Sequence, residues 1–165
     1  MKAYFLDNPE QAVDLAHLQK AGVLHYSVDV ANYTARLDEI CKERGYTYRD
    51  ECHSTKIPDL DKKLPIFLEE HIHDDEEIRF FLNGSGYFDV RDTDDKWVRM
   101  ECGPGDLLIL PAGIYHRFLP DDKMFFHVIR LFVGEPIWTP YNRADASTEE
   151  RPARRTYMSN IPASA

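Results

Sequence analysis

Cysteine is scarce in this chain, and its few copies form no recognisable motif. The 165 residues include three cysteines, Cys41, Cys52 and Cys102, an odd number at wide spacing. No CxxC pair is present, which argues against a zinc site built from thiolates. Scattered cysteines fit a reducing compartment better than a disulfide framework, so we expect a cytoplasmic protein.

Runs of positive charge and long apolar runs are also absent. The net charge is -9, and lysine and arginine are dispersed along the chain. Because phosphate binding requires concentrated positive charge, we expect neither nucleic acid nor an anionic membrane as a partner. No apolar stretch reaches the roughly 20 residues of a membrane span, and the acidic N-terminus lacks the apolar core of a signal peptide.

The remaining composition is that of an ordinary globular protein. Hydrophobic residues make up 43% and charged residues 30% of the chain. A chain of this length can bury a core of its own, so we expect a single domain over residues 1–165. No uncovered apolar stripe is evident, and we expect a monomer.

Residues 1–65 contain mixed patterns in which helix signals recur. Asn8 before Pro9 is a favourable helix start, and Gly22 and Gly45 are favourable stops. A third short helix is interrupted by Pro65. We expect helices over 8–22, 32–45 and 59–67.

Residues 66–140 alternate short aromatic and β-branched segments with turns, as in an antiparallel sheet. We expect strands over 71–73, 77–82, 87–91, 97–101, 106–110, 115–119 and 125–133. Asn83-Gly84 suits a tight hairpin turn, because both residues tolerate positive φ. Short, evenly spaced strands predict a mainly β fold, an antiparallel barrel or jelly roll with a few peripheral N-terminal helices. Residues 141–165 are polar and predict an extended tail, with partial order against the barrel as the alternative.

Three histidines and one glutamate in these segments suggest a metal site. His71, His73 and Glu77 share parity, so one strand face would present all three if no bulge intervenes. His116 follows in the proline-glycine context of PAGIYHRF. Neutral imidazole and carboxylate suit Fe(II), Ni(II), Mn(II), Co(II) and Zn(II) alike. Four protein ligands leave two octahedral positions for a substrate, which indicates an enzyme.

The alternative for each histidine is a structural role. A single strand histidine is usually hydrogen bonded in the core or at the surface, and an HxH pair alone is a weak signal. The metal interpretation depends on the four residues together. Four other histidines have no matching partners and are interpreted as structural: His17, His25, His53 and His127.

These residues resemble the two cupin motifs. The first motif, G(X)5HXH(X)3,4E(X)6G, is matched from His71 to Gly84, with Pro65 in place of its leading glycine. The second, G(X)5PXG(X)2H(X)3N, is matched from Gly105 to His116, with Pro120 in place of its asparagine. Both departures lie away from the ligands.

Within the cupins, the chain resembles acireductone dioxygenase over residues 23–143. The segments EEHIHDDEEIRFFLNGSGYFDVRD and RLFVGEPIWTPYNR carry this resemblance. It implies a bent β-barrel that binds one Fe(II) or Ni(II) through His71, His73, Glu77 and His116. It also implies cleavage of acireductone (1,2-dihydroxy-3-keto-5-methylthiopentene) with O2 in methionine salvage. Members of this family can also occur in the nucleus, which nothing in this chain indicates.

The resemblance further implies a metal-dependent outcome and a set of pocket residues. With iron the products would be 4-methylthio-2-oxobutanoate and formate, and with nickel methylthiopropanoate, carbon monoxide and formate. Arg79 would offset the charge of the anionic substrate, because a guanidinium stays protonated in a dry pocket. Its alternative is a salt bridge to a nearby acid. The resemblance implies further substrate-binding residues: Phe67, Phe118, Arg130 and Trp138. For the aromatic residues the alternative is plain core packing.

Two other functions remain open from the sequence. Cupins include other metal-dependent oxygenases, decarboxylases and isomerases, because fold does not set function. A non-enzymatic metal-binding cupin is a third possibility. Arg79 and the segment FVGEPIWTPYNR argue for acireductone dioxygenase, since the general cupin motifs do not require them.

Overall fold

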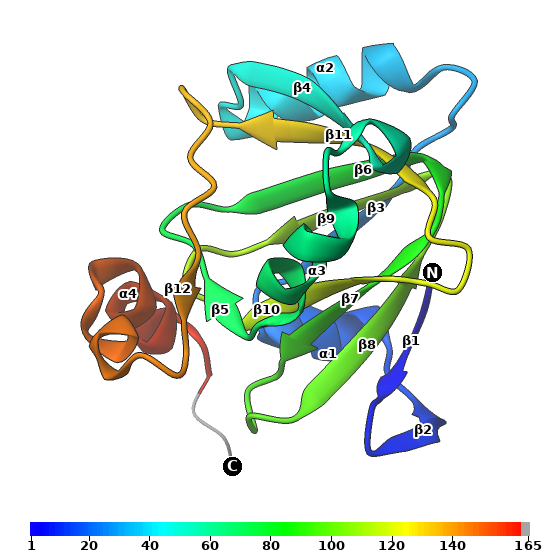
Figure 1. Cartoon of the computed structure of the whole chain (residues 1–165). Coiled ribbons are helices and arrows are strands. Elements are labelled where there is room, and N and C mark those ends of the chain that lie inside the picture. Colours follow the sequence, from blue (N-terminus) through cyan, green and yellow to red (C-terminus); the bar gives the residue numbers. More distant parts are fainter. Residues whose placement is uncertain (163–165) are drawn as a thin grey trace.

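The computed structural model describes residues 1–162, and its main feature is a pair of antiparallel sheets (Figure 1). One sheet has seven strands in the order β12-β5-β10-β7-β8-β1-β2, and the other has five in the order β3-β9-β6-β11-β4. The seven strands are β12 (Tyr141–Asn142), β5 (His71–Ile72), β10 (His116–Pro120), β7 (Gly86–Arg91), β8 (Trp97–Cys102), β1 (Lys2–Phe5) and β2 (Asn8–Ala12). The five are β3 (Leu24–Ser27), β9 (Asp106–Leu110), β6 (Glu77–Gly84), β11 (Phe126–Phe132) and β4 (Tyr48–His53). The mainly β fold predicted from the sequence is confirmed.

The first helix was predicted over residues 8–22, and its predicted start is wrong. Residues from Asn8 form β2, and the helix α1 (Leu15–Lys20) begins further along the chain, with Asp14 as its N-cap. β2 is the edge strand of its sheet. An edge strand tolerates Pro9, which has no N–H to donate to a neighbouring strand. The same proline that marks a helix start is therefore also compatible with an exposed strand.

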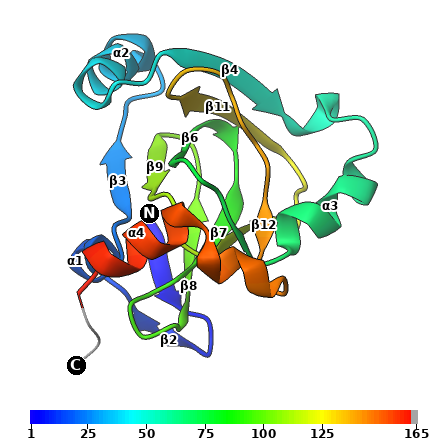
Figure 2. The same ribbon diagram turned by 90° about the vertical axis from the view of Figure 1, so that its left-hand side faces the viewer.

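The other two predicted helices are present. The helix α2 (Tyr33–Arg44) ends at Gly45, whose φ of 78° places it in the left-handed region that favours glycine. The helix α3 (Leu60–Leu68) contains Pro65, and a short 3₁₀ helix, η1 (Ser54–Lys56), precedes it. Figure 2 shows α2 at the upper left and α3 at the right of the sheets, so the two helices lie at different edges.

The predicted Asn-Gly hairpin is wrong, although both flanking strands exist. β6 belongs to the five-stranded sheet and β7 to the seven-stranded sheet, so Asn83-Gly84 lies where the chain passes between sheets. Gly84 has a φ of 72°, and a Cβ there would lie 2.3 Å from the carbonyl oxygen of Phe125. Glycine is required here by backbone conformation and by close packing, not by a two-residue hairpin.

The five-stranded sheet separates two apolar clusters. Between the two sheets lie Phe81, Phe88, Val128 and other buried residues. On its outer face, Ile78, Phe80 and residues of β9 and β11 pack against Leu37 and Ile40 of α2. Successive residues of β6 therefore face different surroundings, as strand alternation requires.

The predicted extended tail is instead folded over its described part. After β12 the chain forms η2 (Ala146–Glu150) and the helix α4 (Pro152–Asn160), with Pro152 in the first turn. Arg154 and Tyr157 are buried, and the Tyr157 hydroxyl donates to the carbonyl of Ala21 at 2.8 Å. The last part of the predicted tail, residues 163–165, lies outside the described residues. No helix within residues 1–162 is long and apolar enough to cross a membrane.

Candidate metal centre

Three histidines converge between the sheets. His71 on β5 and His116 on β10 are paired in register, and His73 follows one residue after β5. One ring nitrogen from each lies within 4.8 Å of the others. His71 and His116 are buried, and His73 is partly buried. The histidines that the sequence singles out are thus brought to one point by strand pairing.

Glu77 reaches this point from the opposite sheet. It is the first residue of β6, and its Oε2 lies 2.6 Å from Nε2 of His116. The prediction that one strand face presents His71, His73 and Glu77 is wrong, because residues 73–76 carry the chain from one sheet to the other. The four side chains converge through the packing of two sheets and not through parity along one strand.

The hydrogen bonds of the histidines orient their rings. Nδ1 of His71 lies 2.6 Å from the carbonyl oxygen of Glu69, Nδ1 of His73 lies 3.0 Å from that of Thr139, and Nδ1 of His116 lies 2.9 Å from that of Ile114. A carbonyl oxygen only accepts, so Nδ1 carries the proton in each ring. Each Nε2 therefore presents a lone pair, as metal-binding histidines do.

Nε2 of His116 tests whether these residues suit a metal ion. This atom is buried and has no hydrogen-bond partner of acceptable geometry within residues 1–162, although Oε2 of Glu77 is close. A buried polar atom without a partner is costly. A cation shared by the imidazole and the carboxylate would satisfy both groups, so the residues fit a bound metal.

The pKa values of these groups agree with a donor set for a cation. Burial, with the charges of His116 and His73, lowers the pKa of His71 to about 3. Burial also lowers the pKa of His73. Burial alone would raise the pKa of Glu77, but Arg79 and the histidines outweigh it and hold that pKa well below its usual value. Neutral imidazoles and an ionised carboxylate are the forms that bind metal.

Arg79 lies two residues after Glu77 on the same face of β6. Its Nη2 is 2.8 Å from Oε1 of Glu77, and its Nη1 donates to the carbonyl of Ile78 at 2.9 Å. Burial lowers the pKa of Arg79, and Glu77 acts in the opposite direction. The salt bridge considered as the alternative role of Arg79 therefore exists, and the same guanidinium also lines the cavity described next.

A cavity of about 360 Å³ opens in front of the histidines. Arg79 and the four predicted substrate-binding residues all line it. The rings of Phe67 and Phe118 meet edge to face at 6.4 Å. Trp138 is half exposed and lies 4.9 Å from the guanidinium of Arg130.

Arg130 has a partner that sequence reasoning missed. Its guanidinium makes two hydrogen bonds of 2.7 Å to the carboxylate of Asp50. Asp50 lies directly opposite Arg130 in the pairing of β4 with β11. Only this pairing brings the two together, and nothing in the local sequence of Asp50 indicates it.

A smaller cavity of about 100 Å³ continues inward between the sheets. It shares Glu77, Arg79 and Phe118 with the metal cavity, and its other walls are apolar apart from Arg130 and the Cys52 thiol. Burial raises the pKa of Cys52. The joined space therefore has a charged end at the histidines and an apolar end in the core.

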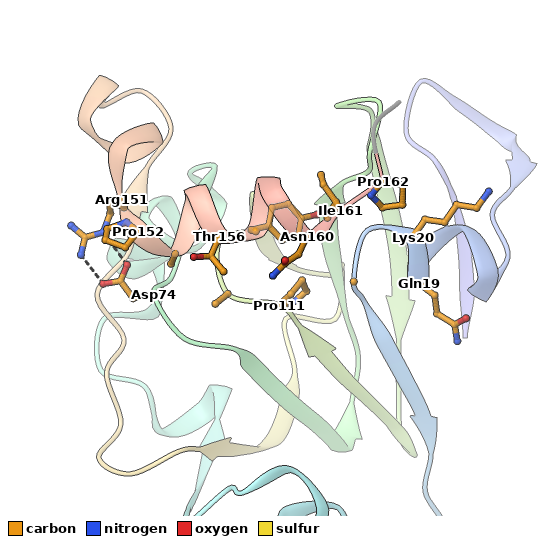
Figure 3. Close-up of a pocket in the computed structure, with 14 residues that line it drawn as sticks. Gln19, Lys20, Asp74, Pro111, Arg151, Pro152, Thr156, Asn160, Ile161 and Pro162 are labelled. Atoms are coloured by element: carbon orange, nitrogen blue, oxygen red, sulfur yellow. Dashed lines mark hydrogen bonds and ion pairs between the residues drawn. The ribbon is translucent and has the colours of Figure 1, made fainter. Parts of the chain in front are cut away.

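The structure has a larger cavity elsewhere, of about 710 Å³, between α1 and α4 (Figure 3). Its labelled side chains include Lys20, Thr156 and Asn160, with the Asp74–Arg151 ion pair at one end. No histidine or cysteine is among the described residues that line it. We therefore place the chemistry at the smaller cavity, where the potential ligands converge.

Comparison with known sequences assigns the chain to one family. Residues 6–140 match the sequence profile described as the ARD/ARD' family. Acireductone dioxygenase from Branchiostoma floridae is 46% identical over 162 residues, covering 97% of this chain and 90% of that protein. Acireductone dioxygenase 4 from Arabidopsis thaliana is 48% identical, covering 93% and 83%. The Dictyostelium discoideum acireductone dioxygenase is 49% identical, covering 87% and 99%.

A solved structure shows the same architecture. Acireductone dioxygenase from Bacillus anthracis, with a cadmium ion in its active centre, superposes with a TM-score of 0.73 at 25% sequence identity. The match covers 84% of this chain and 96% of that one. The predicted cupin barrel is thereby confirmed, and the related structure holds a metal ion in its active centre.

Proposed function

This chain belongs to the ARD/ARD' family of acireductone dioxygenases, and we propose that His71, His73, Glu77 and His116 bind the single metal ion of its active site. The chain is a metal-binding oxidoreductase of the cupin fold. The observation that carries the ligand assignment is the shared orientation of the three imidazoles. Each donates Nδ1–H to a backbone carbonyl, which leaves Nε2 free to bind.

We propose Fe(II) or Ni(II) as the ion, one per chain. Three neutral imidazoles and a carboxylate form a donor set of intermediate softness, which both ions accept. When bound, the ion would supply Lewis acidity and a template for two substrate oxygens. Glu77 would contribute one negative charge, so the bound centre would remain positive toward an anionic substrate.

Arg79 would counter the charge of the substrate. Acireductone reacts as an enediolate anion, and an anion in a closed cavity requires a fixed positive charge nearby. Arg79 lines the cavity beside Glu77 and cannot lose its proton in a protein. Its ion pair with Glu77 and its hydrogen bond to the Ile78 carbonyl hold the guanidinium in position. Arg79 would thus orient the substrate head at the metal end of the cavity.

The apolar tail of the substrate would extend into the inner cavity. About 100 Å³ admits roughly three water-sized groups, since water occupies roughly 30 Å³ in the liquid. A methylthioethyl group is of this size, and a thioether packs favourably on aromatic rings such as Phe118. This placement aligns the polar head with Arg79 and excludes water behind it.

The proposed reaction depends on the ion. With iron the chain would form 4-methylthio-2-oxobutanoate and formate, and with nickel methylthiopropanoate, carbon monoxide and formate. The test is to reload apoprotein separately with each ion, add acireductone and O2, and analyse the products. Those two product sets would support the proposal. Metal bound at one ion per chain with no consumption of acireductone would contradict it and favour another cupin substrate.

Two further expectations remain proposals. We propose that the protein acts as a monomer, because the site described above is formed within one chain. We also propose a cytoplasmic location from its scattered, unpaired cysteines, all of which are free in the structure.

A further inference from the structure

A further cavity adjoins the metal cavity. It has a volume of about 390 Å³ and lies where η1 and α3 pass the edge strand β4. Lys63, Phe67 and Arg130 line both this space and the metal cavity, so the two adjoin at these side chains. We call this space the side cavity. Its remaining lining residues are Glu51, Cys52, His53, Lys56, Ile57, Pro58 and His127.

Basic side chains outnumber acidic ones among the described residues that line the side cavity: Lys56, Lys63 and Arg130 against Glu51. Arg130 is paired with Asp50, and Glu51 accepts a hydrogen bond from His127 at 2.8 Å. Lys56 and Lys63 are exposed, and within residues 1–162 neither has a carboxylate at ion-pair distance. The side cavity therefore has two ammonium groups without an ion-pair partner, on a chain whose net charge is -9.

Another cavity that adjoins the metal cavity has the reverse charge. It has a volume of about 240 Å³ and is lined by four carboxylates, those of Asp74, Asp75, Glu76 and Glu135. Asp74 pairs with Arg151 and Glu76 with Arg44, whereas Asp75 and Glu135 have no cationic partner in the described part of the chain. Asp75 and Glu76 also line the metal cavity. The metal cavity thus adjoins one basic and one acidic cavity.

From this asymmetry we propose that the side cavity binds the incoming substrate anion before it reaches the metal centre. This rests on the proposed function, which makes the substrate an enediolate. Clefts lined by one sign of charge raise the local concentration of the opposite ion. An anion approaching the acidic cavity is repelled, whereas Lys56 and Lys63 attract it toward Phe67. The guanidinium groups of Arg130 and Arg79, which are paired with Asp50 and Glu77, line the metal cavity beyond it.

The first test measures anion attraction without turnover. Iodide, an anionic quencher, and acrylamide, a neutral one, are titrated against the tryptophan emission of metal-loaded protein. Trp138 lies in the metal cavity, which Lys63 also lines, and Trp97 contributes an unchanged background between Arg91 and Arg117. For Lys63→Gln we expect iodide quenching to fall by about twofold, with acrylamide quenching unchanged.

The matched control is Lys62→Gln. It removes the same charge from the neighbouring position of α3, and Lys62 does not line the side cavity. We expect its iodide quenching to equal that of the unmodified chain. Equal iodide quenching in Lys63→Gln and Lys62→Gln would overturn the proposal.

The second test measures turnover against salt. We expect the double variant Lys56→Gln/Lys63→Gln to lose about fivefold in kcat/KM at low ionic strength, through KM, and to recover at high salt. The control Lys42→Gln/Lys62→Gln makes the same change in net charge outside the cavity. An equal loss in both double variants would overturn the proposal. If no variant turns over acireductone, the proposed function fails, and the iodide measurement still decides whether the side cavity attracts anions.

Discussion

The two faces of the five-stranded sheet use alternate residues of the same strands for opposite purposes. On β6, Ile78 and Phe80 point outward into the apolar cluster under α2, whereas Glu77 and Arg79 point inward to the metal cavity. On β11, Ile129 and Leu131 are in the outer cluster and Arg130 lines the cavity. One face is filled with aliphatic and aromatic groups, and the other holds charges around open space.

The difference shows what allows charge in the interior of a small barrel. Glu77 has Arg79 as its counterpart, and Arg130 has Asp50. A buried charge without a partner would cost several kcal/mol. Among the buried side-chain polar atoms of residues 1–162, Nε2 of His116 lacks a partner, and this is where we place the metal. The outer face carries apolar side chains that need no charge partner, and their burial contributes to stability.

Among changes around the metal cavity, replacing a metal ligand should have the largest effect. Loss of a hydrogen bond that orients a metal ligand typically lowers metal affinity roughly 10- to 100-fold. We expect His116→Ala, which removes a ligand itself, to lower metal affinity by more than this and to abolish turnover. The control is His17→Ala, because His17 hydrogen bonds Asp92 outside the site. Metal analysis and oxygen uptake check both variants. Full metal occupancy in His116→Ala would refute its role as a ligand.

The same substitution in the outer cluster and beside the cavity should separate stability from function. Phe80 is fully buried in the outer cluster, and we expect Phe80→Ala to cost about 3–5 kcal/mol of unfolding free energy. Its folded fraction should retain kcat/KM. Phe118 lines open space, so Phe118→Ala should cost less stability but change the reaction rate. Denaturant unfolding with kinetics compares them, and identical effects on kcat/KM would contradict the division.

Removing the charge of Arg79 should impair turnover while leaving the metal in place. We expect Arg79→Met to lower kcat/KM roughly hundredfold, as loss of one fixed donor to a developing charge does. Arg79→Lys should recover part of this loss, since it restores charge but not the planar guanidinium. Metal content is measured in parallel. Unchanged kcat/KM in Arg79→Met would exclude the charge-offset role.

The smallest expected effect concerns substrate selection by the inner cavity. Cys52→Leu should fill part of that space and lower kcat/KM by about tenfold for acireductone, because small changes in an apolar pocket are worth roughly one to three kcal/mol. For an analogue with a methyl group in place of the tail, Cys52→Leu should leave kcat/KM unchanged. The control Cys52→Ala should turn over acireductone and this analogue alike. An equal loss of kcat/KM in Cys52→Leu for acireductone and for the analogue would show that the substrate tail does not enter the inner cavity.

The sequence predicted the parts of this fold that depend on local pattern. Alternating apolar residues located β7, β8 and β9 almost to the residue, and Gly45 located the end of α2. The helix α4 was missed because its stability comes from distant contacts: Arg154 donates to the carbonyl of Gly113, and Tyr157 to that of Ala21. Such contacts leave no periodic signal in a polar segment.

The candidate site was predictable to a similar degree. Ligand types and spacing singled out His71, His73, Glu77 and His116, and the structure brings them together. The sequence could not show that Glu77 approaches from the opposite sheet, because parity describes a single strand only. Nor could it show that Asp50 neutralises Arg130, which depends on strand register.

The central claim is that three Nε2 atoms and one carboxylate from opposing sheets share one ion. The most direct measurement is a crystal structure of the nickel-loaded protein with anomalous diffraction at the nickel edge. We expect one anomalous peak bound by Nε2 of His71, His73 and His116 and by an oxygen of Glu77. A peak bound by Nδ1 atoms, or located away from these four residues, would contradict it.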